Sequence, residues 1–248
     1  MSPEAPLKEK MKEKPVINLP ASDLPIKPLT VHDVEKALKK KISRIYKEFR
    51  GGFKFIKNQT KSVTFFGSSR FKEGNAHYAI ARRIGERLAK LGYTVVTGGG
   101  PGIMEAGNRG AYEAGGVSLG LNIELSTVQA VNPYLTKNFN FFYFFTRKVM
   151  LTFSAEAYLF FPGGFGTLDE FFELLTLVQT NKIEKVPIIA VGRDYWSKLH
   201  DFIQDEMYEK HAAIDKSDMN LYTITDDEDE IVNIIKNVPV RTGARDIE

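Results

Sequence analysis

The chain of 248 residues is 43% hydrophobic and 26% charged, an ordinary globular composition with enough apolar content for a sizeable core. It contains no cysteine, which excludes disulfides, thiolate metal sites and a cysteine nucleophile. The formal net charge of +3 is mild and basic residues are not interleaved with aromatic ones, so nucleic acid is not expected as a partner. The four histidines, His32, His77, His200 and His211, lack the spacing of a metal site.

No run of the sequence approaches the ~20 apolar residues of a membrane-spanning helix. The first residues are polar and proline-rich and lack the apolar core of a signal peptide. We therefore expect a cytoplasmic protein with no membrane partner.

The N-terminal part of the chain differs in composition from the rest. Residues 1–29 hold six of the eleven prolines and little apolar periodicity, which predicts a flexible arm. Residues 30–60 are predicted as a helix and linker, because apolar residues recur at helical spacing and Thr30 can cap the first turn. Gly51 and Gly52 are expected to end this helix. Residues 61–238 form the main predicted domain, and residues 239–248 a flexible tail.

Strands and helices are predicted to alternate through the main domain. Strands are expected at 62–67, 93–97, 117–122, 139–145, 157–161, 186–191 and 221–224, and helices near 75–91, 102–115, 146–154, 167–181, 195–210 and 227–236. Several strands are uninterrupted apolar runs, as in a sheet that is covered on both faces. The alternation implies right-handed βαβ units. The sequence therefore predicts an α/β, Rossmann-like, doubly wound and mostly parallel sheet with helices on both faces.

The strand at 157–161 is expected to end in a glycine loop. The loop comprises Pro162, Gly163, Gly164, Phe165, Gly166 and Thr167, and a helix follows it. This arrangement turns backbone N–H groups toward an anion, and glycine permits close approach of a phosphate. Asp169 and Glu170 are expected in the first helical turn, where the dipole favours carboxylates. Since a carboxylate would repel a phosphate, one of them is expected to face ribose hydroxyls or a reacting carbon.

Two further loops follow predicted strands. One begins at Thr97 and continues through Gly98, Gly99, Gly100, Pro101 and Gly102 to Met104, and the other consists of Gly67, Ser68, Ser69 and Arg70. In a parallel sheet these loops would meet at the carboxyl edge of the strands, where α/β sheets bind ligands. The three loops together predict a site for a phosphorylated sugar or a nucleotide.

A dinucleotide site is the alternative to this interpretation. The G-x-G-x-x-G pattern should follow the first strand of its unit, whereas the glycine cluster here follows the second strand. The segment from Gly100 to Glu105 also lacks the final Gly or Ala of the pattern. Glu124, at the end of the next strand, is the one feature that fits a ribose-binding acid. The sequence therefore disfavours NAD.

Residues 139–145 are densely aromatic. A buried strand or a subunit contact is the simpler interpretation, and a platform that stacks on a base is the alternative. Arg147 and Lys148 follow at an expected strand-to-helix junction. They form either a solvated basic pair, or Arg147 enters the site to hold a phosphate, a base or a catalytic carboxylate.

The motifs together resemble those of a known family. The segment from Pro162 to Glu170 matches the P-G-G-x-G-T-x-x-E motif of the LOG ("lonely guy") proteins, which are cytokinin riboside 5′-monophosphate phosphoribohydrolases. The segment from Gly98 to Met104 resembles their second glycine motif, and Arg147-Lys148 resembles their Arg-Lys pair. Many relatives carry an old label of lysine decarboxylase, but nothing in this sequence suggests a pyridoxal-phosphate site.

The resemblance implies hydrolysis of the N-glycosidic bond of a nucleoside 5′-monophosphate, with AMP or an N6-substituted AMP favoured. The products would be a free base and ribose 5-phosphate, and no cofactor would be needed. Glu170 would be the catalytic acid residue and Arg147 its partner, within a catalytic domain at 61–238. The nucleotide would be bound by Gly67, Ser68, Ser69, Thr97, Gly98, Gly99, Gly100, Gly102, Met104, Lys148, Pro162, Gly163, Gly164, Gly166 and Thr167.

The resemblance also implies a homodimer or a higher homo-oligomer with the site near the subunit interface. Phe145-Thr146 stands where plant-like relatives have a Met-His-x lead-in, and the N-terminal arm and helix are long. Both departures resemble the longer bacterial branch, and they leave the preferred base open.

The chemistry fits a carboxylate in this setting. Cleavage of the bond between C1′ and the base builds positive charge on the ribose, as in glycoside hydrolysis, and a carboxylate there can stabilise the charge and orient water. A non-catalytic module that binds nucleotide or molybdenum cofactor is the second hypothesis. A DNA-processing protein of similar fold is the third, and the weak net charge disfavours it.

Overall fold

The computed structural model describes residues 31–59, 61–124 and 131–239. The predicted arm at 1–29, the predicted cap Thr30 and nearly all of the predicted C-terminal tail lie outside these ranges. Helix α1 (Val31–Ile56) crosses the boundary between two units, residues 1–40 and residues 41–248. The described part of the first unit, residues 31–40, exposes every side chain. The second unit contains the sheet and all the other described helices.

The second unit is built on a parallel sheet in the order β4-β3-β2-β1-β5-β6-β7. The strands are β1 (Ser62–Phe66), β2 (Thr94–Thr97), β3 (Ser118–Ile123), β4 (Lys137–Phe141), β5 (Ala157–Phe160), β6 (Ile188–Ala190) and β7 (Thr223–Ile224). All residues of β1, β2, β5 and β6 are buried. Central strands buried on both faces explain why they appear in the sequence as short apolar runs without alternation.

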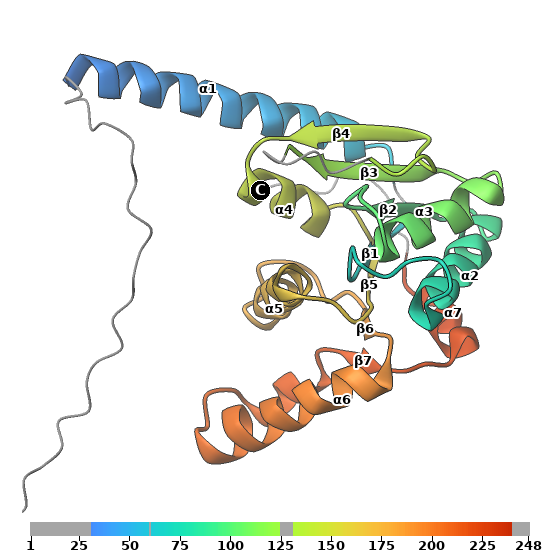
Figure 1. The fold of residues 1–248 in the computed structure, drawn as a ribbon. Coiled ribbons are helices and arrows are strands. Elements are labelled where there is room, and N and C mark those ends of the chain that lie inside the picture. The colour runs from blue at the N-terminus through green and yellow to red at the C-terminus, as the bar shows by residue number, and fades with distance from the viewer. Residues whose placement is uncertain (1–30, 60, 125–130, 240–248) are drawn as a thin grey trace, which may run out of the picture. The chain divides into compact units, whose positions relative to one another are not determined.

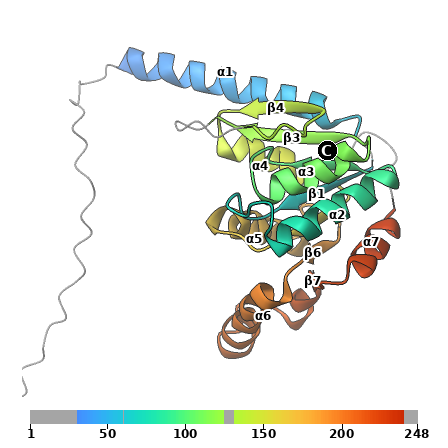
Figure 2. The same cartoon turned by 45° about the vertical axis from the view of Figure 1, so that its right-hand side comes forward.

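Helices cover both faces of this sheet (Figures 1 and 2). One core cluster joins the sheet to α2 (Ala76–Lys90), α3 (Ile103–Glu113) and α7 (Glu228–Lys236). The other joins it to the end of α1, α4 (Phe144–Thr152), α5 (Phe165–Gln179) and α6 (Arg193–Phe202). A π-helix at Ile203–Lys210 prolongs α6, and a 3₁₀ helix spans Lys216–Asn220. The predicted doubly wound α/β fold is confirmed, and within the described ranges no helix is long and apolar enough to cross a membrane.

The strand order reverses between β1 and β5. The chain adds β2, β3 and β4 on one side of β1 and then returns to place β5 on the other side. At such a switch point the loops that leave the carboxyl ends of neighbouring strands diverge and leave a crevice between them. Here the loop after β1 touches the loop after β5, since the Ser68 N–H donates to the Pro162 carbonyl at 3.0 Å. The topology therefore brings the first and third predicted loops together.

Helix α1 does not end at Gly51 and Gly52, contrary to the prediction. It continues to Ile56, and the two glycines lie where the helix touches the rest of the unit. A Cβ on Gly51 would lie 2.6 Å from the Phe139 ring, and one on Gly52 would lie 2.6 Å from Met150 Cγ. The glycines are there for close packing, which outweighs their low helix propensity.

The predicted aromatic strand at 139–145 is also wrong in its second half. Strand β4 ends at Phe141, where its pairing with β3 ends, and Phe144 already begins α4. Helix α5 starts at Phe165, so Asp169 and Glu170 lie in its second turn and not in its first. This places Glu170 one turn away from the helix N-terminus, and so apart from the N–H groups that would hold an anion.

Helices α2 and α3 pack closely through glycines. A Cβ on Gly85 would lie 2.5 Å from the Gly107 carbonyl oxygen, and a Cβ on Gly110 would overlap the backbone of Arg82. We expect Gly110→Ala to lower the free energy of unfolding by about 1–3 kcal/mol, because the clash is with backbone atoms that cannot rotate away. Urea denaturation measures this loss.

Gly166→Ala is the matched control for that measurement. Gly166 is also helical, but a Cβ there would meet no atom within 4 Å. Its free energy of unfolding should stay within about 0.5 kcal/mol of wild type. Equal losses in the two variants would mean that helix approach is not what the Gly110 position requires.

Candidate active site

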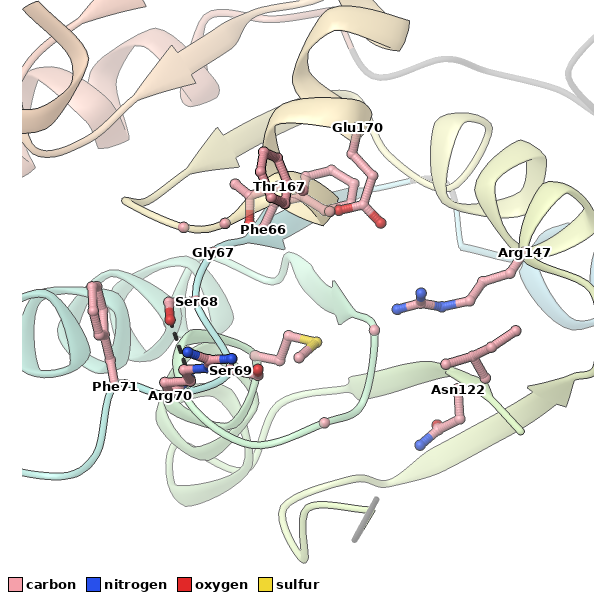
Figure 3. Close-up of a pocket in the computed structure, with 18 of the residues that line it drawn as sticks. Phe66, Gly67, Ser68, Ser69, Arg70, Phe71, Asn122, Arg147, Thr167 and Glu170 are labelled. Atoms are coloured by element: carbon pink, nitrogen blue, oxygen red, sulfur yellow. Dashed lines mark hydrogen bonds between the residues drawn. The ribbon is translucent and has the colours of Figure 1, made fainter. Parts of the chain in front are cut away.

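A cavity of about 930 Å³ opens at the carboxyl ends of the central strands (Figure 3). Its size is that of a small-molecule site. Most of the predicted site residues line it, namely Gly67, Ser68, Ser69, Gly98, Gly100, Met104, Arg147, Pro162, Gly163, Gly164, Gly166, Thr167 and Glu170. The structure thus gathers the loops after β1, β2 and β5 and the first turn of α4 around one space.

The glycine loop after β5 presents the N-terminus of α5 to the cavity. The N-cap residue Gly164 offers no side chain to the free backbone N–H groups, so those groups are left for a ligand. The Thr167 side chain packs against Gly163 at a distance that leaves no room for a Cβ. Tyr195, on α6, holds the loop in place, because its hydroxyl donates to the Gly163 carbonyl at 2.9 Å. The loop therefore presents free backbone N–H groups to the cavity, which is the arrangement that can hold an anion.

Glu170 projects from the second turn of α5 into the cavity (Figure 3). Its carboxyl group has no hydrogen bond or ion pair with any residue in the described ranges. Burial raises the pKa of Glu170 to about 7, the Arg147 and Lys148 cations pull it down, and the Asp169 and Glu173 carboxylates push it up. A carboxyl group with this pKa can exchange a proton near neutral pH, as a general acid or base must.

Arg147 points into the same space from α4 (Figure 3). It is only 9% exposed, and burial lowers the pKa of its guanidinium while the Glu170 carboxylate raises it. Its Nε donates to the Leu121 carbonyl on β3 at 2.7 Å, which fixes the direction of the side chain. A Cβ on Gly98 would overlap its Nη2 atom, so the glycine leaves room for the guanidinium.

Four predicted site residues do not line the cavity: Thr97, Gly99, Gly102 and Lys148. The Thr97 hydroxyl donates to Asn108 and accepts from the Gly99 N–H at 2.8 Å, which holds the turn after β2 together. Gly102 has a φ of 75° and lies against Ser68, whose carbonyl accepts from the Ile103 N–H at 3.0 Å. These residues shape the second loop, whereas Gly98, Gly100 and Met104 of the same loop line the cavity.

Lys148 turns away from the cavity and pairs with α5. Its Nζ lies 2.8 Å from Asp169 and 3.2 Å from Glu173. Lys148 thus makes a contact between α4 and α5, and its role in nucleotide binding stays a prediction. Asp169, the other carboxylate that the sequence offered for the catalytic role, is the partner of Lys148 and does not line the cavity.

Sequence reasoning did not consider five residues that also border the cavity, namely Phe71, Asn122, Ile123, Val131 and Tyr195. Five others border it as well and lie in segments discussed above without having been assigned to the site: Arg70, Glu124, Asn140, Phe144 and Phe165. Asn122 is a buried residue near the carboxyl end of β3 and Glu124 directly follows the strand, so their position at a strand end was the available signal. Phe144 comes from the aromatic run and is 57% exposed. In residues 31–59, 61–124 and 131–239 no group of three or more His, Asp or Glu could hold a metal.

The raised pKa of Glu170 has a consequence for stability. A folded-state pKa near 7, above the ordinary value of 4.5, means that ionisation of Glu170 opposes folding; this cost is absent below about pH 4.5 and complete above about pH 7. We expect Glu170→Gln to melt higher than wild type at pH 8, by roughly 2–4 °C for each kcal/mol recovered, and no higher at pH 4.5. Thermal scans at the two pH values measure the difference, and a gain of equal size at both would contradict a buried carboxylate.

Comparison with known proteins agrees with this geometry. The family model described as "Possible lysine decarboxylase" matches residues 104–235, more than half of the chain. The cytokinin riboside 5′-monophosphate phosphoribohydrolase of Rhodococcoides fascians is 28% identical over 158 residues, which cover 62% of this chain and 77% of that protein. The pyrimidine/purine nucleotide 5′-monophosphate nucleosidase of Escherichia coli K12 is 28% identical over 140 residues, 51% of this chain and 31% of that protein.

Solved structures share the fold. The X-ray structure of TM1055 superposes with a TM-score of 0.56 and 26% identity, covering 72% of this chain and 99% of that chain. The molybdenum cofactor carrier protein of Chlamydomonas reinhardtii has a TM-score of 0.53 at 19% identity, covering 71% of this chain and 96% of that chain, a likeness of fold alone. The family model matches more than half of the chain, and the relatives and the geometry of the cavity agree with it. The chain belongs to the LOG family, whose model is described as "Possible lysine decarboxylase".

Proposed function

We propose that this protein hydrolyses the N-glycosidic bond of a nucleoside 5′-monophosphate to a free base and ribose 5-phosphate. The observation that carries the proposal is the position of Glu170, a half-buried carboxyl group that faces the cavity beside the open N-terminus of α5. An anion-binding loop and a proton-exchanging carboxyl group, one helical turn apart, suit a substrate whose phosphate lies next to its reacting carbon. The activities named for the two relatives support the same reaction class.

The phosphate is assigned to the glycine loop. Backbone N–H groups at the start of α5 would bind its oxygens, and the Thr167 hydroxyl and the loop containing Ser68 would complete the cradle. Arg70 borders the same part of the site and adds a positive charge. Binding energy from the phosphate would hold the ribose in place for the reaction, although the phosphate itself does not react.

The base is assigned to the opposite end of the cavity. Phe144 offers an exposed aromatic face there, and Asn122 and Asn140 offer hydrogen-bonding groups. These groups suit an adenine or an N6-substituted adenine, which AMP and its N6-substituted derivatives supply. The homo-oligomer implied by the resemblance and the cytoplasmic location expected from the sequence remain predictions.

Glu170 acts on water at C1′ in this proposal. As the bond from C1′ to the base nitrogen breaks, its electron pair leaves with the base and positive charge builds on the ribose. The ionised Glu170 carboxylate stabilises that charge and accepts a proton from the water that adds to C1′. The departing base takes up a proton, so water is divided between the two products. Arg147 stabilises the ionised form of Glu170 across the cavity.

The experiment that tests this function is an assay for base release. The purified protein is incubated with AMP, N6-isopentenyl-AMP, GMP, CMP and UMP, and free base is separated by chromatography. Wild type should release base, and Glu170→Gln should lose about 10²-fold or more in kcat, because the amide cannot accept the proton. Asp169→Asn is the matched control, since this neighbouring carboxylate pairs with Lys148 outside the cavity and its loss should change kcat far less.

Two outcomes would contradict the proposal. A Glu170→Gln variant with wild-type turnover would remove Glu170 from the catalytic role. No base from any nucleotide, together with a nucleotide-dependent rise in melting temperature, would indicate a binding module, as in the carrier proteins that share the fold.

A further inference from the structure

The N-terminal helix contributes a buried carboxylate that no proposed catalytic step uses. Glu48, on the part of α1 that belongs to the second unit, is only 7% exposed. Charged side chains are rarely buried to this degree unless they are paired or hydrogen-bonded. The partners of Glu48 therefore indicate what the residue does.

Those partners are the first residues of α4 and the turn that precedes it. The Phe142 N–H donates to Glu48 Oε1 at 3.1 Å, and the Tyr143 N–H donates to Oε2 at 3.3 Å. The buried Thr146 hydroxyl lies 2.6 Å from the same Oε2. Tyr143 is the N-cap of α4 and provides no side-chain cap of its own. A carboxylate from a distant helix thus accepts from the backbone N–H of the N-cap residue and of the residue before it, and it lies near the start of α4, where the helix dipole favours a negative charge.

The turn that Glu48 binds leads directly into the helical turn that contains Arg147. The Arg147 N–H makes a backbone hydrogen bond of α4 to the Tyr143 carbonyl at 3.2 Å, and Arg147 directly follows Thr146. The far end of the Arg147 side chain is held separately, by the Leu121 carbonyl on β3. The direction of the guanidinium therefore depends on where the first turn of α4 lies relative to β3.

Arg44, one turn before Glu48, ties the same three elements together. Its guanidinium lies 3.5 Å from Glu48, 3.0 Å from Glu124 at the end of β3 and 3.6 Å from the centre of the Phe142 ring. Helix α1 thus contacts both the strand end and the helix start between which Arg147 is held.

We infer that Glu48 is a positioning residue for Arg147, through which α1 becomes part of the catalytic machinery. The catalytic part of this inference rests on the proposed function. The geometric link between Glu48 and Arg147 does not depend on that function. Removal of Glu48 leaves the Phe142 and Tyr143 N–H groups without their acceptor, whereas the Thr146 hydroxyl keeps the Tyr143 carbonyl at 2.8 Å, so the turn before α4 shifts to find new partners for the two N–H groups. Arg147 then moves relative to Glu170.

The test uses the ionisation of Glu170 as its readout. The groups that act on this carboxyl are Arg147 and Lys148 from α4 and Asp169 and Glu173 from α5. The full chain is labelled with ¹³C at glutamate side chains, and the Glu170 signal is identified by its loss in Glu170→Gln. Its titration is then followed in wild type, Glu48→Ala, Arg147→Ala and the double variant. Glu35→Ala is the matched control, because it removes an exposed carboxylate from the same helix.

Glu48→Ala should raise the pKa of Glu170 in the same direction as Arg147→Ala. It should add little in the double variant, because its effect passes through Arg147. With AMP as substrate, kcat should fall about tenfold in Glu48→Ala while KM changes little, as for a displaced catalytic partner. Glu35→Ala should match wild type in every measurement.

Other results would overturn the inference. A folded Glu48→Ala with an unshifted Glu170 titration, or shifts that add fully in the double variant, would leave Glu48 a purely structural residue. If Glu48→Ala does not fold, Glu48→Gln, which keeps the shape and one acceptor oxygen, provides the same comparison. The Glu170 titration could shift as expected in a protein that releases no base. That result would retain the link between Glu48 and Arg147 and reject the proposed hydrolysis, so failure of the inference and failure of the proposed function are distinguishable.

Discussion

A half-buried carboxyl group from α5 and a buried guanidinium from α4, those of Glu170 and Arg147, face one cavity. The guanidinium keeps its proton under all ordinary conditions, so Arg147 is a fixed charge. Its attraction limits the rise that burial causes in the pKa of Glu170, which settles at about 7 and not higher. A carboxyl group in an apolar setting without such a cation would be neutral at working pH, and one in open water would be a weak base. The pKa of Glu170 is thus a balance between desolvation and its neighbouring charges, of which Arg147 has the largest effect.

The fold supplies this balance through backbone geometry more than through side chains. Parallel pairing brings the three loops to one edge of the sheet, and the reversal of strand order at β1 places the loop after β5 beside the loop after β1. Glycines let these loops come close to one another and to Arg147. Gly98 has no side chain where the Arg147 guanidinium lies against it. Gly164, the N-cap of α5, has no side chain to bind the free N–H groups of the first turn. The same helix provides both the free N–H groups and the carboxyl group, so in the proposed function one rigid element would place both the phosphate and the reacting carbon.

The sequence was sufficient for the layers of the fold and for the loops that meet, because uninterrupted apolar runs and glycine loops are local signals. It was insufficient where tertiary contacts override local preference. Gly51 and Gly52 lie inside α1, since Phe139 and Met150 approach the helix at those positions. The aromatic run changes from strand to helix at a turn whose backbone N–H groups donate to Glu48. Because Glu48 lies 98 residues before Thr146 in the chain, no local pattern could show this contact. Lys148 follows Arg147 in sequence but points to a different neighbour, because adjacent helical residues face different directions.

The central claim is that the phosphate lies at the start of α5 while C1′ lies beside Glu170. A crystal structure of Glu170→Gln with AMP bound tests it most directly, since the substitution preserves shape and slows turnover. We predict the phosphate within hydrogen-bonding distance of the N–H groups of residues 163–167 and C1′ next to the side chain at position 170. A phosphate bound elsewhere in the cavity, or a C1′ on the far side from position 170, would contradict this claim.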